Sequence, residues 1–148
     1  MTGFLDTEAQ LPYCPGCGHP HVLRALDQAL QASGTPAEQI VLFDRKAGEL
    51  EARGYTLNVD GPGVRCQGAQ AWEQPQEVAG TTQRVHDVML RCNALINIPA
   101  LKEHGTSGFT SALKNHYGTI DRPGRLHGGN CDPAIPELNA LAAIRDKT

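Results

Sequence analysis

The sequence predicts an α/β fold in which a mostly parallel sheet is flanked by helices, with Rossmann-like layering. One observation is the order of elements near the start, where an amphipathic helix is followed closely by a short apolar strand and another helix. The same order returns in the second half, from about residue 85. A third observation is size, because 148 residues with 40% hydrophobic content can bury a core of their own.

The first half supplies the clearest helix. Apolar residues recur at helical period over residues 21–33, namely Val22, Leu23, Leu26, Ala29 and Leu30. Gly34 and Pro36 then provide two helix stop signals. The run QIVLFD reads as a buried strand, RKAGELEARG as a short helix and YTLNV as a second strand.

The second half begins with little periodicity. We expect residues 61–84 to be irregular or edge structure, with a short strand at GVRCQG. A helix is predicted at 85–92, a buried strand at 93–99 and another helix at 108–118. A Gly-rich loop then leads to a helix that has Asp132 as its N-cap and Pro133 at its first position.

Composition excludes several classes of function. A net charge of −3 offers no basic stripe for nucleic acid, and no segment reaches the roughly 18 apolar residues of a membrane span. The N-terminus has no basic region followed by an apolar one, so we expect no secretory signal and a cytoplasmic location. Residues 1–60 carry eight acids against four Lys and Arg, whereas residues 100–148 carry five against six. The second half is therefore the better place for an anionic ligand.

The segment 94–118 has the arrangement of a ligand site. In open parallel sheets ligands bind where strands end and helices begin. Here the predicted loop supplies Lys102 and His104, and a Gly/Ser/Thr turn that includes Gly108 offers backbone N–H groups. A helix start of this kind binds carboxylates or phosphates.

Helical spacing divides the predicted helix into two faces. The apolar face, which we expect to be buried, consists of Phe109, Ala112, Leu113 and Tyr117. The polar face consists of Ser107, Ser111 and Lys114. These groups suit an anion, although Ser and Thr can equally cap the helix while Lys114 points into water. His116 borders the apolar face and is expected to be structural, whereas His127 fits either a site or a turn.

Cysteine spacing suggests a metal. Cys14 and Cys17 form a CxxC, which is half of a tetrahedral zinc or iron–sulfur site. The remaining candidate ligands are Cys66, Cys92, Cys131 and His19. Cys92 precedes a predicted buried strand, whereas Cys131 sits in what reads as an exposed loop and is the better partner. We expect an iron–sulfur cluster rather than zinc, the alternative being a tail with incidental thiols.

Several long motifs carry a family resemblance. They are HPHVLRALDQALQASGTPAEQIVLFDR, ELEARGYTLN, GVRCQG, INIPALKEHGTSGFTSALKNHYGTI, RLHGGNCDPAIPELNAL and IRDK. From about His19 onward the chain resembles the domain-of-unknown-function family 362, whose members are often joined to ferredoxin-like modules. Because members are typically longer, the resemblance implies a tail at 1–18 and an incomplete α/β domain at 19–148. It also implies an exposed sheet edge that pairs with a second copy, or a ferredoxin-like partner.

Two shorter resemblances bear on the site. The N-terminal CPGCGH is similar to the start of the thiamine-diphosphate subunit of 2-oxoacid:ferredoxin oxidoreductases, but no diphosphate motif follows, so thiamine is not expected. The layout around His104 and Lys114 is similar to nickel-pincer lactate racemases, in which a His precedes the cofactor-bearing lysine by ten residues. That racemase pattern has SGG where this chain has TSA.

These inferences lead to one functional expectation and one alternative. We expect a domain that binds a small anionic or cofactor-like ligand and has a redox or proton-transfer role, with His104, Lys114 and His127 as catalytic residues. The ligand-binding residues would be Lys102, Ser107, Gly108, Ser111 and Asn115, and the metal ligands Cys14, Cys17 and Cys131. The alternative is a non-catalytic binding or assembly module.

Overall fold

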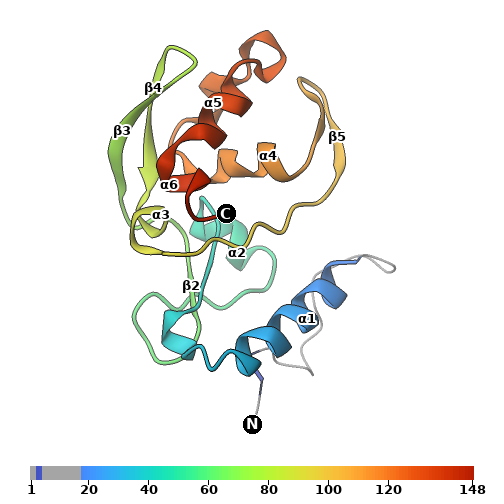
Figure 1. The fold of residues 1–148 in the computed structure, drawn as a ribbon, viewed down its shortest axis with the longest axis vertical. Helices are drawn as coiled ribbons and strands as arrows, with labels where there is room; N and C mark the ends of the chain where they lie inside the picture. Colours follow the sequence, from blue (N-terminus) through green and yellow to red (C-terminus); the bar gives the residue numbers. More distant parts are fainter. Residues whose placement is uncertain (1–2, 5–17) are drawn as a thin grey trace. The chain divides into compact units, whose positions relative to one another are not determined.

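The computed structural model describes residues 3–4 and 18–148, which divide into two compact units, Met1–Gly68 and Ala69–Thr148. Both units contain helices and short strands, so the predicted mixture of helix and strand is confirmed (Figure 1). The described strands form three two-stranded sheets, of which one is parallel and two are antiparallel. The sequence predicts a mostly parallel sheet instead, and these pairs do not make one.

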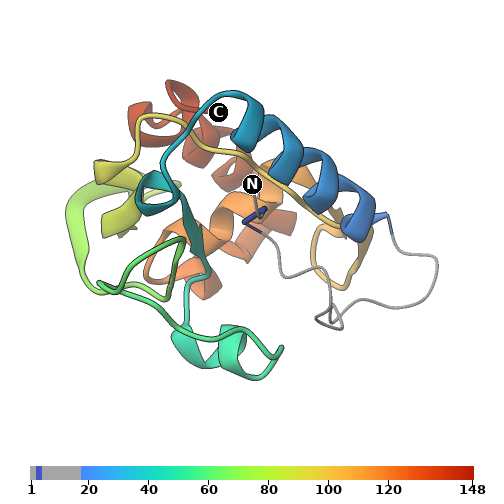
Figure 2. The same cartoon turned by 90° about the horizontal axis from the view of Figure 1, so that it is seen from below.

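The first unit is built around one parallel strand pair. Its elements are α1 (His19–Ala32), the 3-10 helix η1 (Ala37–Gln39), β1 (Val41–Phe43), α2 (Ala47–Glu51) and β2 (Arg65–Gln67), and Figure 2 shows α1 in blue. β1 and β2 pair with Leu42 opposite Cys66. Gly68 ends β2 where a Cβ would lie 2.2 Å from the Ala47 backbone nitrogen, so only glycine allows this approach.

Predictions for this unit are mostly confirmed. The helix at 21–33, the strand in QIVLFD, the helix in RKAGELEARG and the strand in GVRCQG are all present. The strand in QIVLFD is not buried as predicted, since Leu42 is 38% exposed. YTLNV is reduced to a single bridge between Asn58 and Cys66. The apolar stripe of α1 is only half-covered, because no residue of α1 is buried and Val22 is 47% exposed.

The second unit opens with a hairpin that the sequence does not predict. β3 (Trp72–Val78) and β4 (Thr81–His86) pair antiparallel across Ala79 and Gly80, whose φ values of 48° and 68° fit a two-residue turn. A bulge between Glu73 and Pro75 accommodates the proline. The Gly, Pro and Gln content of residues 61–84 conceals these strands, because β3 alternates poorly between polar and apolar residues.

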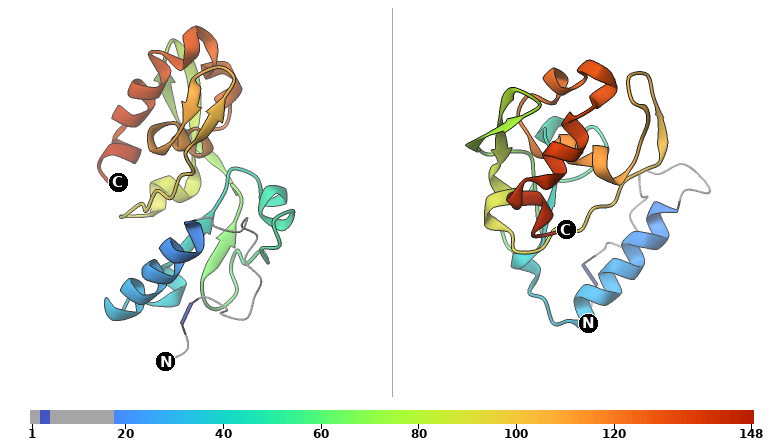
Figure 3. Two further views of the ribbon diagram at one scale, coloured as in Figure 1. Left: turned by 90° about the vertical axis from the view of Figure 1, so that its right-hand side faces the viewer. Right: turned by 45° about the horizontal axis from the view of Figure 1, so that its top comes forward.

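The rest of the second unit is a series of short elements. They are α3 (Asp87–Arg91), β5 (Lys102–His104), β6 (Gly108–Thr110), α4 (Ala112–Asn115), η2 (His116–Thr119), η3 (Pro123–Leu126), η4 (Gly128–Cys131), α5 (Ala134–Ala140) and α6 (Ala142–Arg145). Both views in Figure 3 show the β5–β6 hairpin in orange leading into α4, and α5 and α6 in red. A bridge between Val85 and Ile120 joins the segment after η2 to β4.

Three predictions for this unit are wrong. Residues 93–99 form no strand, and residues 108–118 form β6 followed by a four-residue helix and a 3-10 turn. A single helix there is prevented because Gly108 has φ +75° and Ser111 is extended. The final helix is divided at Leu141, and its N-cap is Pro133 rather than Asp132.

The core of the second unit lies between the β3–β4 hairpin and the C-terminal helices. Its members are apolar side chains no more than 3% exposed, namely Val78, Val85, Val88, Met89, Ile120, Leu126, Cys131, Ala134, Leu138 and Ile144. They come from β3, β4, α3, the 120s segment, η4, α5 and α6. This core supports the short elements that carry the polar groups described below.

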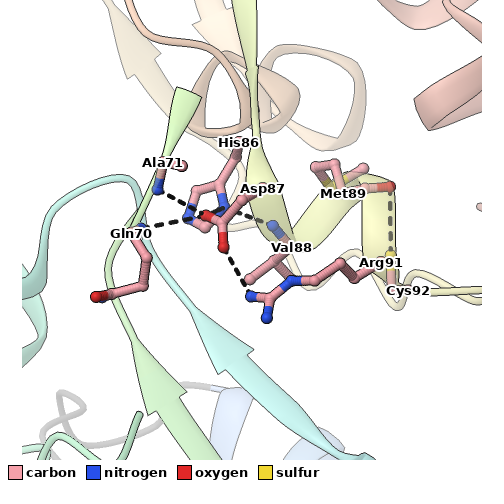
Figure 4. A network of polar contacts seen from close by, with 8 residues as sticks. All are labelled: Gln70, Ala71, His86, Asp87, Val88, Met89, Arg91 and Cys92. Carbon is pink, nitrogen blue, oxygen red and sulfur yellow. Dashed lines mark hydrogen bonds and ion pairs between the residues drawn. The ribbon is translucent and has the colours of Figure 1, made fainter. Parts of the chain in front are cut away.

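Asp87 ties the start of the hairpin to α3 (Figure 4). Its Oδ1 accepts the N–H groups of Gln70 at 3.1 Å and Ala71 at 3.4 Å, and its Oδ2 accepts from Arg91 at 2.7 Å. His86 Nδ1 accepts the Val88 N–H at 3.1 Å and caps α3. That nitrogen also lies 3.1 Å from Asp87 Oδ1, a contact that is attractive only if the ring is protonated there.

We predict that Asp87→Ala lowers the free energy of unfolding by about 2–4 kcal/mol, because two backbone N–H groups lose a buried charged acceptor. Arg91→Ala should cost less than about 1 kcal/mol, since its side chain is 65% exposed and screened by water. Urea denaturation followed by circular dichroism measures both. Asp146→Ala, which removes an exposed ion pair with Arg145, is the matched control. An Asp87→Ala protein as stable as this control would contradict the role of the network.

Candidate functional site

The turn of the β5–β6 hairpin fixes the orientation of His104. His104 pairs with Gly108 across a three-residue turn, and its Nδ1 accepts the N–H groups of Thr106 at 3.2 Å and Ser107 at 3.3 Å. Because Nδ1 accepts, the proton of the neutral ring is on Nε2. The motif HGTSG therefore holds an imidazole with its donor nitrogen directed away from the turn.

The helix after the hairpin places Lys114 inside the protein. Lys114 is 8% exposed and Tyr117 is 6% exposed, whereas Phe109 and Leu113 are 63% and 59% exposed. The predicted buried face is therefore wrong in three of its four members, since Ala112 is exposed as well. The reason is that only four residues are helical, so a spacing argument over eleven residues has no continuous helix to act on.

Lys114 has an unusual set of partners. Its Nζ lies 3.2 Å from His127 Nε2 and 4.3 Å from the centroid of the Tyr117 ring. Among the described residues no carboxylate lies within ion-pairing distance of Lys114. Burial lowers the pKa of this lysine, the neighbouring Cys131 partly offsets that effect, and the charge of Lys102 adds to it.

His127 is held in the tautomer that suits this contact. Its Nδ1 lies 3.0 Å from the Pro123 carbonyl oxygen, which can only accept, so Nδ1 carries the proton and Nε2 faces Lys114 with a lone pair. The ring stacks on His104 with centroids 5.3 Å apart and planes at 16°. It also meets the Tyr117 ring edge-on at 5.4 Å and 87°.

The charges of these groups act on one another. Partial burial, then the positive charges of Lys114, His127 and Lys102, lower the pKa of His104. Lys102 is exposed on β5 and is close enough for its charge to affect both His104 and Lys114. We call Lys102, His104, Lys114, Tyr117 and His127 the lysine–histidine cluster. The cluster contains no Asp or Glu, and four of its five side chains carry cationic or neutral nitrogen groups. This arrangement suits an anion.

Cys131 lies beside this cluster rather than in an exposed loop, and that expectation is wrong. Cys131 is 1% exposed, and a hydrogen bond with it contributes, after burial, to raising the pKa of the Tyr117 hydroxyl. Cys14 and Cys17 lie outside the described residues. No three of the His, Cys, Asp and Glu side chains in the described part of the chain form a group that could hold a metal. A cluster held by Cys14, Cys17 and Cys131 thus remains a prediction.

The other predicted ligand-binding residues are mostly engaged with the protein. Ser107 Oγ donates to the Phe109 carbonyl at 2.8 Å, and Asn115 Nδ2 donates to Asn97 Oδ1 at 2.7 Å. Ser111 is half-buried at the N-cap of α4, and Gly108 lies on β6. The structure therefore brings together His104, Lys114 and His127, with Lys102 nearby, and gives Ser107 and Asn115 local structural contacts.

Two residues of this site escape the sequence analysis. Tyr117 follows Lys114 by three residues, so one helical turn would have placed its ring beneath the ammonium group. Asn97 donates to the Ala112 carbonyl at 2.9 Å and lies 3.0 Å from His116 Nε2, which holds α4 in place. His116 is buried at 4% exposure, in agreement with a structural role, and burial lowers its pKa.

Comparison with known protein families gives one result. The family described as Domain of unknown function (DUF362) matches residues 9–145, which is most of the chain. The chain belongs to the DUF362 family. No curated protein and no solved structure matches the chain. The family resemblance of the long motifs is thereby confirmed, and the lysine–histidine cluster lies within the matched range of this DUF362 protein.

The lengths and composition of the helices in this DUF362 chain bear on whether one of them could cross a membrane. In the described part of the protein, no helix has both the length and the apolar character that crossing a bilayer requires. This agrees with the absence of a long apolar run in the sequence.

We predict that Lys114→Met stabilises the protein at neutral pH by about 1–3 kcal/mol, because methionine fills the same space without a buried polar group. The gain should shrink as the pH rises. The pKa of Lys114 is lower in the folded state than its ordinary 10.5, so between these values the unfolded chain binds more protons and wild-type stability increases with pH. Urea midpoints at several pH values, with the exposed Lys46→Met as control, measure this. An equal gain at every pH would contradict a lowered Lys114 pKa.

Proposed function

We propose that this DUF362 domain binds a small anionic ligand at the lysine–histidine cluster and transfers protons to or from it. The observation that carries the proposal is the buried lysine with imidazole and phenol neighbours and no carboxylate partner among the described residues. A lysine in that position destabilises the fold unless a ligand uses it.

The charges of the cluster favour a carboxylate or phosphate. Partial burial lowers the pKa of His104, and the positive charges of Lys114, His127 and Lys102 lower it further. A bound anion would offset this repulsion and accept from Lys114 Nζ and His104 Nε2. Charge-assisted hydrogen bonds of this kind contribute about 1.5–3 kcal/mol each.

The two histidines supply acid–base chemistry. His104 presents an N–H and His127 presents a lone pair, because the turn and the Pro123 carbonyl fix their tautomers. The His104 Nε2–H can donate to the ligand, whereas the His127 lone pair faces Lys114 Nζ at 3.2 Å and can accept a proton from that amine. His104 is the general acid in this proposal, and His127 acts as a general base through Lys114.

One observation favours a second function, that of an assembly module. Four large apolar side chains on or near the β5–β6 hairpin are exposed, namely Ile96, Leu101, Phe109 and Leu113, with exposures from 56% to 76%. Clustered apolar exposure is typical of surfaces that meet a partner. Self-association or a ferredoxin-like partner on this surface would place that contact close to His104.

Other expectations stay proposals as well. They are a cytoplasmic location, a redox role that uses an iron–sulfur cluster, and parallel Rossmann-like layering. The CxxC spacing and the long family motifs support them.

For the anion site, we predict that inorganic phosphate and lactate raise the melting temperature of the wild type and bind more tightly near pH 6 than near pH 8, because a bound anion favours protonated His104 and Lys114. Lys114→Met should weaken binding by about tenfold or more, which corresponds to about 1.4 kcal/mol. Isothermal titration calorimetry measures the affinity.

Lys46→Met is the matched control, because it removes one positive charge from an exposed position of the first unit. If neither anion binds the wild type, or if Lys114→Met and Lys46→Met bind equally well, the proposed function is wrong.

For the cysteines, we predict that anaerobic reconstitution with iron and sulfide gives a brown protein, and that Cys14→Ser and Cys17→Ser each lose the colour. Cys131→Ser tests the third ligand. Cys92→Ser is the control, because its thiol donates to the Met89 carbonyl, at 3.8 Å. A colourless wild type with no bound iron would contradict the cluster.

A further inference from the structure

The contact between Lys114 and His127 allows a proton transfer that a residue serving only to bind an anion does not need. Such a residue works best as a fully charged ammonium, yet Lys114 Nζ faces the lone pair of an imidazole at 3.2 Å. The opposite side of the ring is fixed by Pro123, so the accepting nitrogen cannot turn away. An ammonium that donates to such a nitrogen can pass its proton to it and become a neutral amine.

We propose that Lys114 is a nucleophilic amine that forms an imine with a small 2-oxo acid. This rests on the proposed function, because the carboxylate of the 2-oxo acid occupies the anion site. The inference adds a covalent bond and a substrate class to that site.

The steps balance without an oxidant or reductant. His127 Nε2 takes a proton from the Lys114 ammonium, and the neutral Nζ attacks the carbonyl carbon. One proton then moves from Nζ to the former carbonyl oxygen, which gives a carbinolamine. The His127 imidazolium protonates this hydroxyl, which leaves as water while the C=N bond forms, and the remaining Nζ proton stays on the product as a protonated imine. One water is released per imine, and His127 returns to its starting state.

The surroundings of Lys114 favour imine formation over an ion pair with a carboxylate. Lys114 is only 8% exposed, and its amine lies over the Tyr117 ring. The pKa of Lys114 is lowered by burial, so a larger share of this amine is neutral than of an exposed lysine. Each unit of lowering raises the neutral fraction tenfold when the pH lies well below the pKa.

The anionic part of the substrate has its own partners. His104 offers Nε2–H, and the exposed Lys102 on β5 adds positive charge near both His104 and Lys114. In a 2-oxo acid the carboxylate is bonded directly to the carbonyl carbon. His127, which lies within hydrogen-bonding distance of Lys114, stacks on His104. A carboxylate held near His104 therefore brings the carbonyl carbon close to Lys114.

The test is reductive trapping on the full chain. Protein is incubated at neutral pH with sodium cyanoborohydride and pyruvate, lactate or acetone, and the modified lysine is located by peptide mass spectrometry. The chain has four lysines, at positions 46, 102, 114 and 147, so each can be followed separately. We expect pyruvate to modify Lys114 about tenfold or more faster than Lys46, because the bound carboxylate holds the carbonyl carbon near the Lys114 amine. Acetone, which lacks the carboxylate, should not show this preference, and lactate, which lacks the carbonyl, should give no adduct.

Variants separate covalent chemistry from folding. Lys114→Arg keeps the charge and cannot form an imine, so the intact protein should lose the fast pyruvate adduct, while Lys46→Met should keep it. His127→Gln should slow trapping at Lys114 and flatten its dependence on pH, which a merely structural role would not do.

The outcomes distinguish this inference from the proposed function. If pyruvate and lactate both bind by calorimetry but pyruvate is not trapped at Lys114, the imine is ruled out and the anion site stands. If pyruvate modifies all four lysines equally, the imine inference is also wrong. Absence of both binding and trapping contradicts the two proposals together.

Discussion

The burial of Lys114 without an acidic partner among the described residues is the constraint on which the second unit is organised. A buried amine needs a hydrogen-bond acceptor and is stabilised by an aromatic ring beside it. His127 Nε2 is the acceptor, 3.2 Å from Lys114 Nζ, and the centroid of the Tyr117 ring lies 4.3 Å from the same nitrogen. The Tyr117 hydroxyl donates to the Leu126 carbonyl at 3.0 Å, which places the next residue, His127, over the lysine. The 3-10 turns η2 and η3 thus position Tyr117 and His127 against Lys114, and the β5–β6 hairpin places His104 against His127.

The surrounding framework makes this contact possible. Asp87 ties the β3–β4 hairpin to α3, and the segment after η2 returns to β4, where Asp121 N–H donates to the Arg84 carbonyl at 3.0 Å. α5 holds α4 through Asn139, whose Nδ2 donates to the Leu113 carbonyl at 2.9 Å. Short elements without a large sheet are therefore fixed by side-chain bonds to the backbone, which replace the regularity that long helices and strands supply.

The stability cost of the buried Lys114 and the chemistry proposed for it have one cause. Burial disfavours the ammonium form, which both weakens the fold at neutral pH and makes the amine a better nucleophile. The same argument explains why the cluster contains imidazoles rather than carboxylates. A carboxylate beside Lys114 would stabilise the ammonium and raise its pKa, and the amine would then be a worse nucleophile.

The sequence by itself determined α1, α2 and the strands β1 and β2, because periodicity, stop signals and short apolar runs are local properties. It also singled out His104, Lys114 and His127, since an excess of polar and basic groups near a turn is visible without coordinates. Only the tertiary structure decided that β3 and β4 pair, that 108–118 is not one helix, and that Lys114 rather than Phe109 is buried. The reason is that the two-residue turn at Ala79–Gly80, the extended Ser111 and the packing of Tyr117 against His127 depend on contacts between distant residues, which local patterns do not contain.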